Sequence, residues 1–435
     1  MQKPVETAHI KGLSHDGRGI AHIDGKVVFI DQALPGETVT FQYRKRSKNY
    51  AEGIAIDIQN PSADRVQPKC QHFSICGGCS LQHINHEAQL ALKQNNLLEQ
   101  LQHFGQVKPK TILPTIVGPT FAYRHKARLG VKWVAKKNKV LVGFREKSSH
   151  FLADLELCEV LSPPVGQLLN PLSQLIAQFS IKESIPQIEV AIGTDKTALI
   201  FRHLVPFNET DLALLKAFAQ THQIAIYLQP KSLDSIHLYW PNDTDEQITY
   251  LLPEYDIKFV YHPSAFAQVN PFINQQMIKQ ALELLAVDKN EIVLDLFCGF
   301  GNFTLPLAKF TKEVIGIEGN AQAVSQGTQN AALNHMNNVR FLVEDLNKPE
   351  NFGAWSRQSY DKILLDPPRL GAQELLPTIA DIKPKRIVYI SCNPATLARD
   401  AGILVNQYQY QLTQVGIMDM FPQTSHVESM AVFEK

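Results

Sequence analysis

The chain has 435 residues, of which 44% are hydrophobic and 19% are charged, so it can bury large cores and we expect about three domains. Its 42 Lys and Arg residues balance 42 Asp and Glu residues, which excludes a uniformly basic nucleic-acid-binding protein and restricts any polyanion site to a local patch. No stretch approaches the roughly 18 apolar residues that cross a bilayer, and residues 1–10 lack the apolar segment of a secretory signal. We therefore expect a cytoplasmic protein without membrane contact.

Residues 1–62 are predicted to form a small antiparallel β-barrel, because short strands alternate with glycine turns from about residue 8 to residue 60. Three basic residues of this segment, Arg44, Lys45 and Arg46, lie between Tyr43 and Tyr50. Cations flanked by aromatic rings are typical of a barrel loop that contacts phosphates and bases, so these three are candidate nucleic-acid contacts. A solvated hairpin tip is the alternative interpretation.

Residues 63–84 combine an extended, proline-containing linker with closely spaced cysteines. The six cysteines of the chain are too sparse and uneven for a disulfide framework, and clustered thiols in a reducing compartment more often bind metal or do chemistry. The candidate ligands are Cys70, Cys76, Cys79 and the more distant Cys158. Four thiolates can hold zinc or an iron–sulfur cluster, and the spacing does not distinguish the two. His72 and His83 keep a mixed zinc site open as well.

Two segments follow before the pattern becomes more specific. Residues 85–120 begin with leucines at helical spacing, which predicts a helix that packs as a scaffold on the C-terminal domain. Residues 121–261 are predicted to form a mixed α/β central domain, whose first part, residues 121–147, holds nine Lys or Arg residues against one acid. Basic and aromatic side chains interleaved on strands favour nucleic-acid binding, with candidate contacts at Arg124, Lys126 and Arg128. A positively charged sheet face without a ligand is the alternative.

Residues 262–435 are predicted to form a Rossmann-like domain, because apolar strands alternate with helices after residue 285. Ligands of such doubly wound sheets bind at the carboxyl ends of the strands. A glycine turn at Gly299 and Gly301 follows the first strand, and acidic residues, Glu318 and Asp345, follow the next two strands. A carboxylate at the second position can accept hydrogen bonds from a ribose, so we expect a nucleoside cofactor.

The carboxylate beside the glycine turn, Asp295, distinguishes between two nucleoside cofactors. A dinucleotide such as NAD would place its pyrophosphate at the helix start, where this negative charge would repel it. The ammonium group of a sulfonium amino acid would instead be attracted. S-adenosylmethionine is therefore preferred over NAD.

Two motifs near the C-terminus point to methyl transfer onto a ring carbon. Asp366-Pro367-Pro368-Arg369 is similar to a tetrapeptide of amino methyltransferases whose aromatic fourth residue is here Arg369, which favours carbon over nitrogen chemistry. Cys392 lies between a strand and Pro394, an early helix position, where the helix field is expected to lower the pKa of a thiol. A nucleophile is the functional interpretation, and a buried structural cysteine is the alternative. Cys298 is interpreted as core packing.

A thiolate that adds to C6 of a uracil ring makes C5 electron-rich enough to attack a sulfonium methyl group. The adduct must then lose its C5 proton, which requires a base near the site. His426 and Glu428 are both close to the C-terminus, and we favour Glu428. The alternative is that Glu428 only caps a turn.

The assembled motifs resemble the RNA uracil-C5 methyltransferase family, in particular its members that carry a TRAM barrel and a 4Fe-4S cluster and act on 23S ribosomal RNA. The resemblance covers nearly the whole chain, including residues 12–39, the CGGC loop and the YRHKARL stretch at residues 123–129. It implies that Cys392 is the nucleophile, that Glu428 removes the proton, that Phe266 contacts a flipped base and that the four cysteines hold a 4Fe-4S cluster, with zinc as the alternative. The cofactor residues it implies are Gln268, Phe297, Asn302, Glu318, Asp345 and Asp366.

Several alternatives remain open at this point. The same chemistry could act on another 23S rRNA uridine or on a tRNA uridine, and a related enzyme could methylate cytosine C5 or an exocyclic amine. A non-catalytic RNA-binding factor for ribosome assembly is the alternative from another functional class. No obligatory protein partner is inferred.

Overall fold

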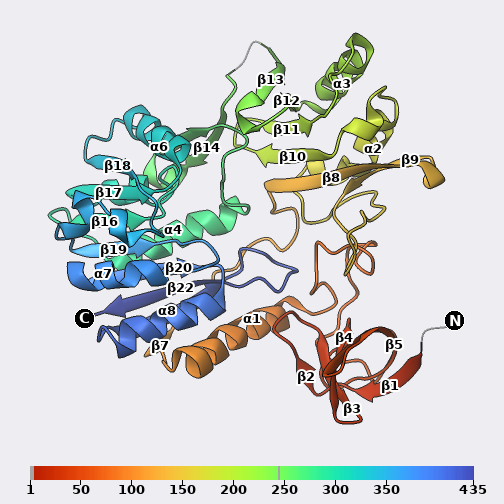
Figure 1. The fold of residues 1–435 in the computed structure, drawn as a ribbon, viewed down its shortest axis with the longest axis horizontal. Helices are drawn as coiled ribbons and strands as arrows, with labels where there is room; N and C mark the ends of the chain where they lie inside the picture. Colours follow the sequence, from red (N-terminus) through yellow and green to blue (C-terminus); the bar gives the residue numbers. More distant parts are fainter. Residues whose placement is uncertain (1–3, 243–244) are drawn as a thin grey trace.

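The structure, a computed structural model, describes residues 4–242 and 245–435. The predicted segments 1–62 and 121–261 thus include residues 1–3 and 243–244, which lie outside the described residues. The described residues form sheets of six, six, two and eight strands. Figure 1 shows the N-terminal sheet and the central sheet as separate bodies beside the C-terminal domain, with α1 (His86–Gln100) running along that domain toward the N-terminal sheet.

The N-terminal sheet has the strand order β1-β5-β6-β4-β3-β2. Its strands are β1 (Val5–His9), β2 (Gly12–Leu13), β3 (Gly19–Ile23), β4 (Lys26–Asp31), β5 (Thr38–Arg46) and β6 (Tyr50–Gln59). Alternate residues of β5, namely Val39, Phe41 and Tyr43, are buried in its core, as the period of two requires. The expectation of an all-antiparallel barrel is wrong in one pairing, because β4 and β6 run parallel. Strand β5 lies between β4 and β6 in the sequence and pairs antiparallel with β6. The chain therefore reverses direction twice between β4 and β6, which makes these two strands parallel.

The central sheet has the order β13-β12-β11-β10-β8-β9 and separates two cores. Its strands are β8 (Lys126–Val134), β9 (Lys139–Gly143), β10 (Gln187–Ile192), β11 (Thr197–Arg202), β12 (Ala225–Gln229) and β13 (His237–Trp240). Leu199 and Phe201 of β11 pack with α2 (Leu169–Ala177) and α3 (Glu209–His222), whereas Ala198 and Ile200 face the opposite core. Because successive strand residues point to opposite faces, one apolar strand serves both cores.

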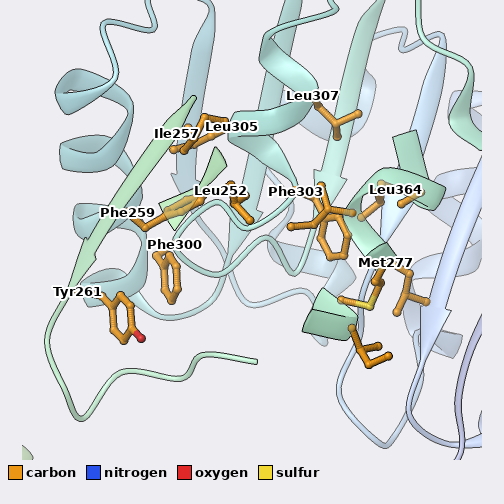
Figure 2. Packing of buried hydrophobic residues seen from close by; sticks show 14 of the residues in the cluster. Leu252, Ile257, Phe259, Tyr261, Met277, Phe300, Phe303, Leu305, Leu307 and Leu364 are labelled. Atoms are coloured by element: carbon orange, nitrogen blue, oxygen red, sulfur yellow. The ribbon is translucent and has the colours of Figure 1, made fainter. Parts of the chain in front are cut away.

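The opposite core joins the central sheet to the C-terminal domain through the hairpin β14 (Ile248–Leu252) and β15 (Ile257–Tyr261). Figure 2 shows hairpin side chains, including Phe259 and Tyr261, next to Phe300 of the glycine turn. The rings of Tyr261 and Phe300 are stacked with centroids 5.2 Å apart. The hairpin therefore supports the turn that the sequence assigns to cofactor binding.

The C-terminal sheet has the order β18-β17-β16-β19-β20-β22-β21-β7. Its strands are β7 (Thr111–Ile112), β16 (Ile292–Leu296), β17 (Glu313–Glu318), β18 (Val339–Val343), β19 (Lys362–Leu365), β20 (Arg386–Ser391), β21 (Gln411–Met418) and β22 (Glu428–Glu434). The strands from β18 to β20 are parallel, and β22 runs antiparallel to β20. This is the doubly wound arrangement that the strand–helix alternation predicts.

Helices cover both faces of the C-terminal sheet. One face packs α4 (Pro271–Leu285), α5 (Thr304–Ala308) and α6 (Ala321–Leu333), and the other packs α1, α7 (Leu376–Ile382) and α8 (Pro394–Asn406). α1 ends in a π-helical turn, Leu101–Gly105, and a Cβ on Gly105 would lie 2.5 Å from the Ala398 carbonyl oxygen of α8. The residue must therefore be small for α1 to lie against α8. Among the helices of the described ranges, none is long and apolar enough to span a bilayer.

Candidate active site

The candidate active site lies along one edge of the C-terminal sheet, at the carboxyl ends of the parallel strands. The strand order brings together residues that the sequence separates widely. From β18 to β22 the edge carries Asp345, Glu318, Phe297, Asp366, Cys392 and Glu428 in that order. β16 and β19 are neighbours in the middle of this edge, and strand order reverses between them, which is where doubly wound sheets form their ligand crevice.

The glycine turn and the end of β17 are held together by hydrogen bonds. The Gly299 N–H donates to one carboxylate oxygen of Glu318 at 3.1 Å, and the Asn320 N–H donates to the other at 2.8 Å. Phe297, at the start of the turn, has φ +63°, a strained conformation for a non-glycine residue. The turn and the residue after the next strand therefore fix the position of Glu318 at this edge of the sheet.

Asp295 is a buried carboxyl group beside this turn. Its Oδ2 accepts a hydrogen bond from the Thr304 hydroxyl at 2.6 Å, but its Oδ1 is buried without a hydrogen-bond partner in the described structure. Burial raises the pKa of Asp295 to about 7. An unpartnered carboxylate oxygen in a buried position is well suited to an ammonium group, because a cation would compensate the unfavourable burial.

Asp366 follows β19, and its N–H donates to the Leu296 carbonyl oxygen of β16 at 3.2 Å. Burial raises the pKa of Asp366 to about 7 as well. The loop that it begins is tied to α8, because the Asn393 side chain donates to the Arg369 carbonyl oxygen at 3.0 Å. The Asp-Pro-Pro-Arg motif is therefore bonded directly to the segment around Cys392.

The other predicted cofactor residues differ in how firmly they are held. Asn302 and Asn274 exchange two amide hydrogen bonds of 2.9 Å, and Asn274 also donates to the Tyr250 hydroxyl at 3.1 Å. Gln268 lies half-buried between β15 and α4. Asp345 is exposed on its loop and accepts a hydrogen bond from the Asn347 N–H at 3.1 Å.

Phe266 lies in the same segment as Gln268 and is 77% exposed. An aromatic ring of this size in water is suited to stacking on a base. Its exposure agrees with a role in contacting substrate, and it stays a prediction.

Cys392 and Glu428 are adjacent because of strand register. Ser391, the last residue of β20, pairs with Ser429 of antiparallel β22. One step further along both strands, Cys392 faces Glu428, although 36 residues separate them in sequence. Glu428 is 6% exposed, and burial, followed by the Asp366 carboxylate, raises its pKa well above the usual range. The predicted nucleophile and the predicted base thus lie on neighbouring strands at the same edge of the sheet.

The expected lowering of the Cys392 pKa is wrong for the protein without ligands. Cys392 does precede α8, whose N-cap is Asn393, as the sequence predicts. Burial nevertheless raises the pKa of the Cys392 thiol, and the Glu428 and Asp366 carboxylates raise it further, whereas Arg369 opposes them. Desolvation and two nearby carboxyl groups outweigh the partial positive charge of a helix end.

His426, the other candidate base, is exposed and makes an edge-on contact with the Phe421 ring at a centroid distance of 5.5 Å. Partial desolvation of the imidazole group lowers its pKa, and the positive charge of Arg369 adds to this effect. Glu428 therefore remains the better candidate, because strand pairing fixes its position opposite Cys392.

The four cysteines Cys70, Cys76, Cys79 and Cys158 line one cavity of about 140 Å³. His72 also lines it, but its ring accepts a hydrogen bond from the Glu156 N–H at 3.1 Å, while His83 is not among the lining residues. Within residues 4–242 and 245–435, no group of three or more His, Cys, Asp or Glu side chains is arranged to hold a metal ion.

The candidate RNA contacts fall into two groups. In the N-terminal sheet, Arg44 forms an ion pair with Asp31 at 2.6 Å, whereas Lys45 is exposed beside the Tyr50 hydroxyl and Arg46 lies over the Tyr43 ring. In the central domain, exposed Arg128 pairs with Glu189 at 3.0 Å.

Arg124 and Lys126 are less available than Arg128. Arg124 lines the cysteine cavity, and the ammonium group of Lys126 donates to the Pro263 carbonyl oxygen. Burial lowers the pKa of Lys126 to about 8.

Comparison with known proteins identifies the chain. A family model for tRNA (Uracil-5-)-methyltransferases matches residues 85–435, and a TRAM domain model matches residues 4–56. The 23S rRNA (uracil(1939)-C(5))-methyltransferase RlmD of Methylococcus capsulatus is 49% identical over 428 residues, which are 98% of this chain and 96% of the relative. The chain belongs to the RNA uracil-C5 methyltransferase family. The enzyme of the same name from Nitrosococcus oceani is 50% identical, in an alignment that covers 100% of this chain and 97% of the relative.

A solved structure of the family has the same fold. The crystal structure of Pyrococcus abyssi tRNA (uracil-54, C5)-methyltransferase in complex with S-adenosyl-L-homocysteine is 25% identical, with a TM-score of 0.74 and coverage of 98% of this chain and 100% of that chain. The chain therefore has an N-terminal TRAM domain and the C-terminal fold of the methyltransferase family, as the motifs predict.

The sequence analysis missed Asn274 and Tyr250, which orient Asn302. One signal was available for Asn274, because it occupies an apolar-face position of α4 together with Ile273, Met277 and Ile278. A polar residue within such a stripe indicates a buried hydrogen-bonding role. No local pattern marks Tyr250, whose role depends on hairpin packing.

Proposed function

We propose that this protein transfers the methyl group of S-adenosylmethionine to C5 of a specific uridine in 23S ribosomal RNA. The observation that carries this proposal is the register that places Cys392 opposite Glu428 beside Asp366. The 23S rRNA methyltransferases at 49% and 50% identity over nearly the whole chain support the substrate class. The solved relative with S-adenosyl-L-homocysteine supports the cofactor.

The cofactor supplies an electrophilic methyl group on a sulfonium sulfur. Glu318 is placed to accept hydrogen bonds from the ribose, and Asp295 to accept the ammonium group. The remaining cofactor contacts are proposed at Gln268, Phe297, Asn302, Asp345 and Asp366. The cation and the buried carboxyl groups stabilise each other, so the pocket favours a positively charged ligand.

The Cys392 thiolate adds to C6 of the uracil, and the C5=C6 electron pair moves to C5 and O4. C5 then takes the methyl group, and the cofactor's carbon–sulfur bond breaks. Ionised Glu428 removes the C5 proton, the double bond re-forms, and the C6–sulfur bond breaks to return the thiolate. The raised pKa of Glu428 makes it a stronger base than an exposed carboxylate.

The uridine must leave its stack to reach this site, since the thiol approaches the ring from one face. Phe266 is proposed to contact the extruded base. Flanking RNA is proposed to bind Arg44, Lys45 and Arg46 of the TRAM domain and Arg124, Lys126 and Arg128 of the central domain.

Methylation assays on two RNAs test the proposal. We expect tritium from labelled S-adenosylmethionine to enter unmodified 23S transcript as 5-methyluridine, identified by nucleoside mass spectrometry. Cys392→Ala should lose at least about a thousandfold in rate, because a removed nucleophile leaves only binding and electrostatic effects. Undiminished transfer by this variant, or 5-methylcytidine as the product, would refute the mechanism. Transfer confined to a tRNA transcript would favour the second candidate substrate, which the Pyrococcus abyssi relative suggests.

We also propose that residues 63–84 form a loop whose Cys70, Cys76 and Cys79, together with Cys158, hold a 4Fe-4S cluster. Thiolate ligands around a shared cavity support this assignment. Protein purified without air should be brown and contain iron and acid-labile sulfide in equal amounts. Cys79→Ser should lose both. Colourless wild-type protein with stoichiometric zinc would contradict the cluster.

A further inference from the structure

Residues 419–427 connect β21 to β22 and lead directly into Glu428; we refer to them as the base loop. Nothing in the catalytic sequence motifs accounts for how this loop is held. Most of its contacts come from three segments far earlier in the chain. They are residues 63–84, which we call the cysteine loop, helix α1 and the start of the central domain. The position of the predicted base therefore depends on segments that lie far from the C-terminal motifs in the sequence.

Gln423 is the most constrained residue of the base loop. It is 5% exposed and has φ +68°, a backbone conformation that a non-glycine residue keeps only when its surroundings enforce it. Its N–H donates to Oε1 of Gln89 at 3.1 Å, and Nε2 of Gln89 donates to Oε1 of Gln423 at 3.1 Å. Gln89 on α1 is itself 1% exposed. Gln89 and Gln423 thus form a reciprocal pair of buried hydrogen bonds.

The cysteine loop holds Gln423 from the other side. The N–H groups of Ser80 and Leu81 donate to the Gln423 carbonyl oxygen at 2.9 and 3.0 Å. These residues directly follow Cys79, one of the proposed cluster ligands. The Ser80 hydroxyl also accepts a hydrogen bond from the Ser425 N–H at 3.1 Å. The segment that follows the cysteines is therefore bonded to the loop that leads into the predicted base.

A buried ion pair anchors the start of the base loop. Lys93 and Asp419 are both 1% exposed at their side chains, and their charged atoms are 2.6 Å apart. Lys93 also donates to the Phe421 carbonyl oxygen at 3.0 Å, and the Tyr123 hydroxyl donates to the Pro422 carbonyl oxygen at 2.9 Å. Gln89 and Lys93 are four residues apart, so they project from the same face of α1 toward the loop.

We propose that Gln89 and Gln423 form a clamp that positions Glu428 for removal of the C5 proton, with the cysteine loop as its fixed support. This inference rests on the proposed function. Both glutamines are positioning residues, because they reach the substrate only through the base loop. A base displaced by about 1 Å can lose about a hundredfold in rate, so a device that fixes the loop matters most for the proton step. Addition of Cys392 to the ring and methyl transfer depend instead on β20 and on the residues proposed to bind the cofactor. Neither Gln89 nor Gln423 belongs to these residues.

The clamp predicts a specific kinetic signature. Gln89→Met retains side-chain length and removes the amide hydrogen bonds to Gln423 and to the Leu81 and Ile84 carbonyl oxygens. The base loop and the segment that supports it both lose a contact to α1, while the apolar packing of α1 is kept. We expect a methylated covalent complex of enzyme and RNA to form at nearly the wild-type rate and to decay about 10- to 100-fold more slowly. Glu428→Gln should show the same pattern more strongly. The complex is measured after rapid quenching as a denaturant-resistant species that carries tritium from the cofactor.

Matched variants separate positioning from general structural damage. Gln94→Met makes the same change on the same helix, at a residue outside these contacts. Gln423→Gly removes the side-chain amide and introduces a residue that adopts φ +68° without strain. Its control, Gln409→Gly, makes the same change at φ +61° outside the base loop. We expect slow decay in Gln89→Met and Gln423→Gly, and wild-type decay in both controls. Cofactor affinity, measured by calorimetry, should be unchanged in all four.

Three outcomes would count against the proposals in different ways. Wild-type decay in both Gln89→Met and Gln423→Gly would overturn the clamp and leave the proposed function intact. Loss of complex formation together with lost cofactor affinity would also overturn it, because that result indicates general structural damage. Failure of wild-type protein to form either the covalent complex or 5-methyluridine would overturn the proposed function, and the clamp with it.

Discussion

At the scale of single residues, buried carboxyl groups dominate the candidate active site. Asp295 and Asp366 both have pKa values of about 7, and burial is the main cause. Such groups are partly protonated at neutral pH when no cation is bound. A sulfonium or ammonium group stabilises their ionised forms, so cofactor binding and proton release are linked.

This linkage predicts how cofactor affinity depends on pH. The ionised fraction of a carboxyl group with a pKa of about 7 rises roughly eightfold between pH 6 and pH 7.5. Since the cation prefers the ionised form, affinity for S-adenosylmethionine should rise with pH over this range, by about that factor for each carboxyl group involved. Above this range the cofactor's own α-ammonium begins to lose its proton, which limits the gain.

Titration calorimetry checks this prediction. Binding measured in two buffers of different ionisation enthalpy should reveal net proton release near pH 7. Asp295→Asn, which cannot ionise, should weaken both the release and the pH dependence. Affinity that falls between pH 6 and pH 7.5 would show that the bound state favours the protonated carboxyl groups instead.

At the scale of elements, the glycine turn between β16 and α5 offers two positions with different consequences. A Cβ on Gly299 would meet nothing within 4 Å, beside the N–H that bonds to Glu318. A Cβ on Gly301 would lie 3.0 Å from the Phe341 ring and 3.3 Å from Cγ of Leu305. Both glycines have positive φ, of 56° and 100°. Gly299 therefore adjoins open space at the predicted cofactor site, and Gly301 adjoins packed core.

Alanine at these two positions should separate ligand binding from stability. Gly299→Ala adopts a left-handed conformation at a cost of about 1 kcal/mol in unfolding free energy, and its methyl group enters the crevice. We expect a small change in Tm and at least a tenfold loss of cofactor affinity. Gly301→Ala combines strain with overpacking and should cost more than about 2 kcal/mol. Thermal unfolding and calorimetry measure the two effects; the reverse ranking of Tm would disprove this assignment.

At the scale of the whole molecule, the N-terminal sheet is joined to the rest through a small core of Leu34, Leu81 and Ile84. Leu34 belongs to the TRAM domain, and the other two follow the cysteines. The same cysteine loop contacts the base loop. Segments that are proposed to bind RNA are thus connected by packing to the segment that carries the base.

Because the net charge is zero, we expect RNA affinity to depend on a few exposed cations and not on the overall charge of the protein. The dependence of the affinity on salt concentration measures how many of these cations contact phosphates. Lys45→Ala combined with Arg46→Ala should reduce the slope of log affinity against log salt by about one to two, because two phosphate contacts are lost. Arg44→Ala should change it less, since Asp31 already neutralises that guanidinium. Filter binding with a 23S fragment provides the measurement. Equal slopes for all variants would place the RNA elsewhere.

Much of the fold follows from the sequence because its signals are local. Apolar strands that alternate with helices, the glycine turn and the acidic residues after successive strands are each encoded within a few neighbouring residues. The same holds for the position of Cys392 before a helix. These signals predicted the strand–helix alternation of the C-terminal domain and the acidic residues after its strands, whereas Phe297, Gln268 and Asn302 were implied only by the family resemblance.

Tertiary structure decided what depends on contacts between distant segments. The pairing of Ser391 with Ser429 places Cys392 against Glu428, and no local pattern encodes that register. The raised pKa of Cys392 reverses the local expectation, because burial and carboxyl groups from other strands outweigh its own helix end. The hydrogen bonds between Gln89 and Gln423 join residues that are 334 positions apart in the sequence. The sequence by itself determined which groups are present, and folding determined which of them meet, because hydrogen bonds and desolvation act through space and not along the chain.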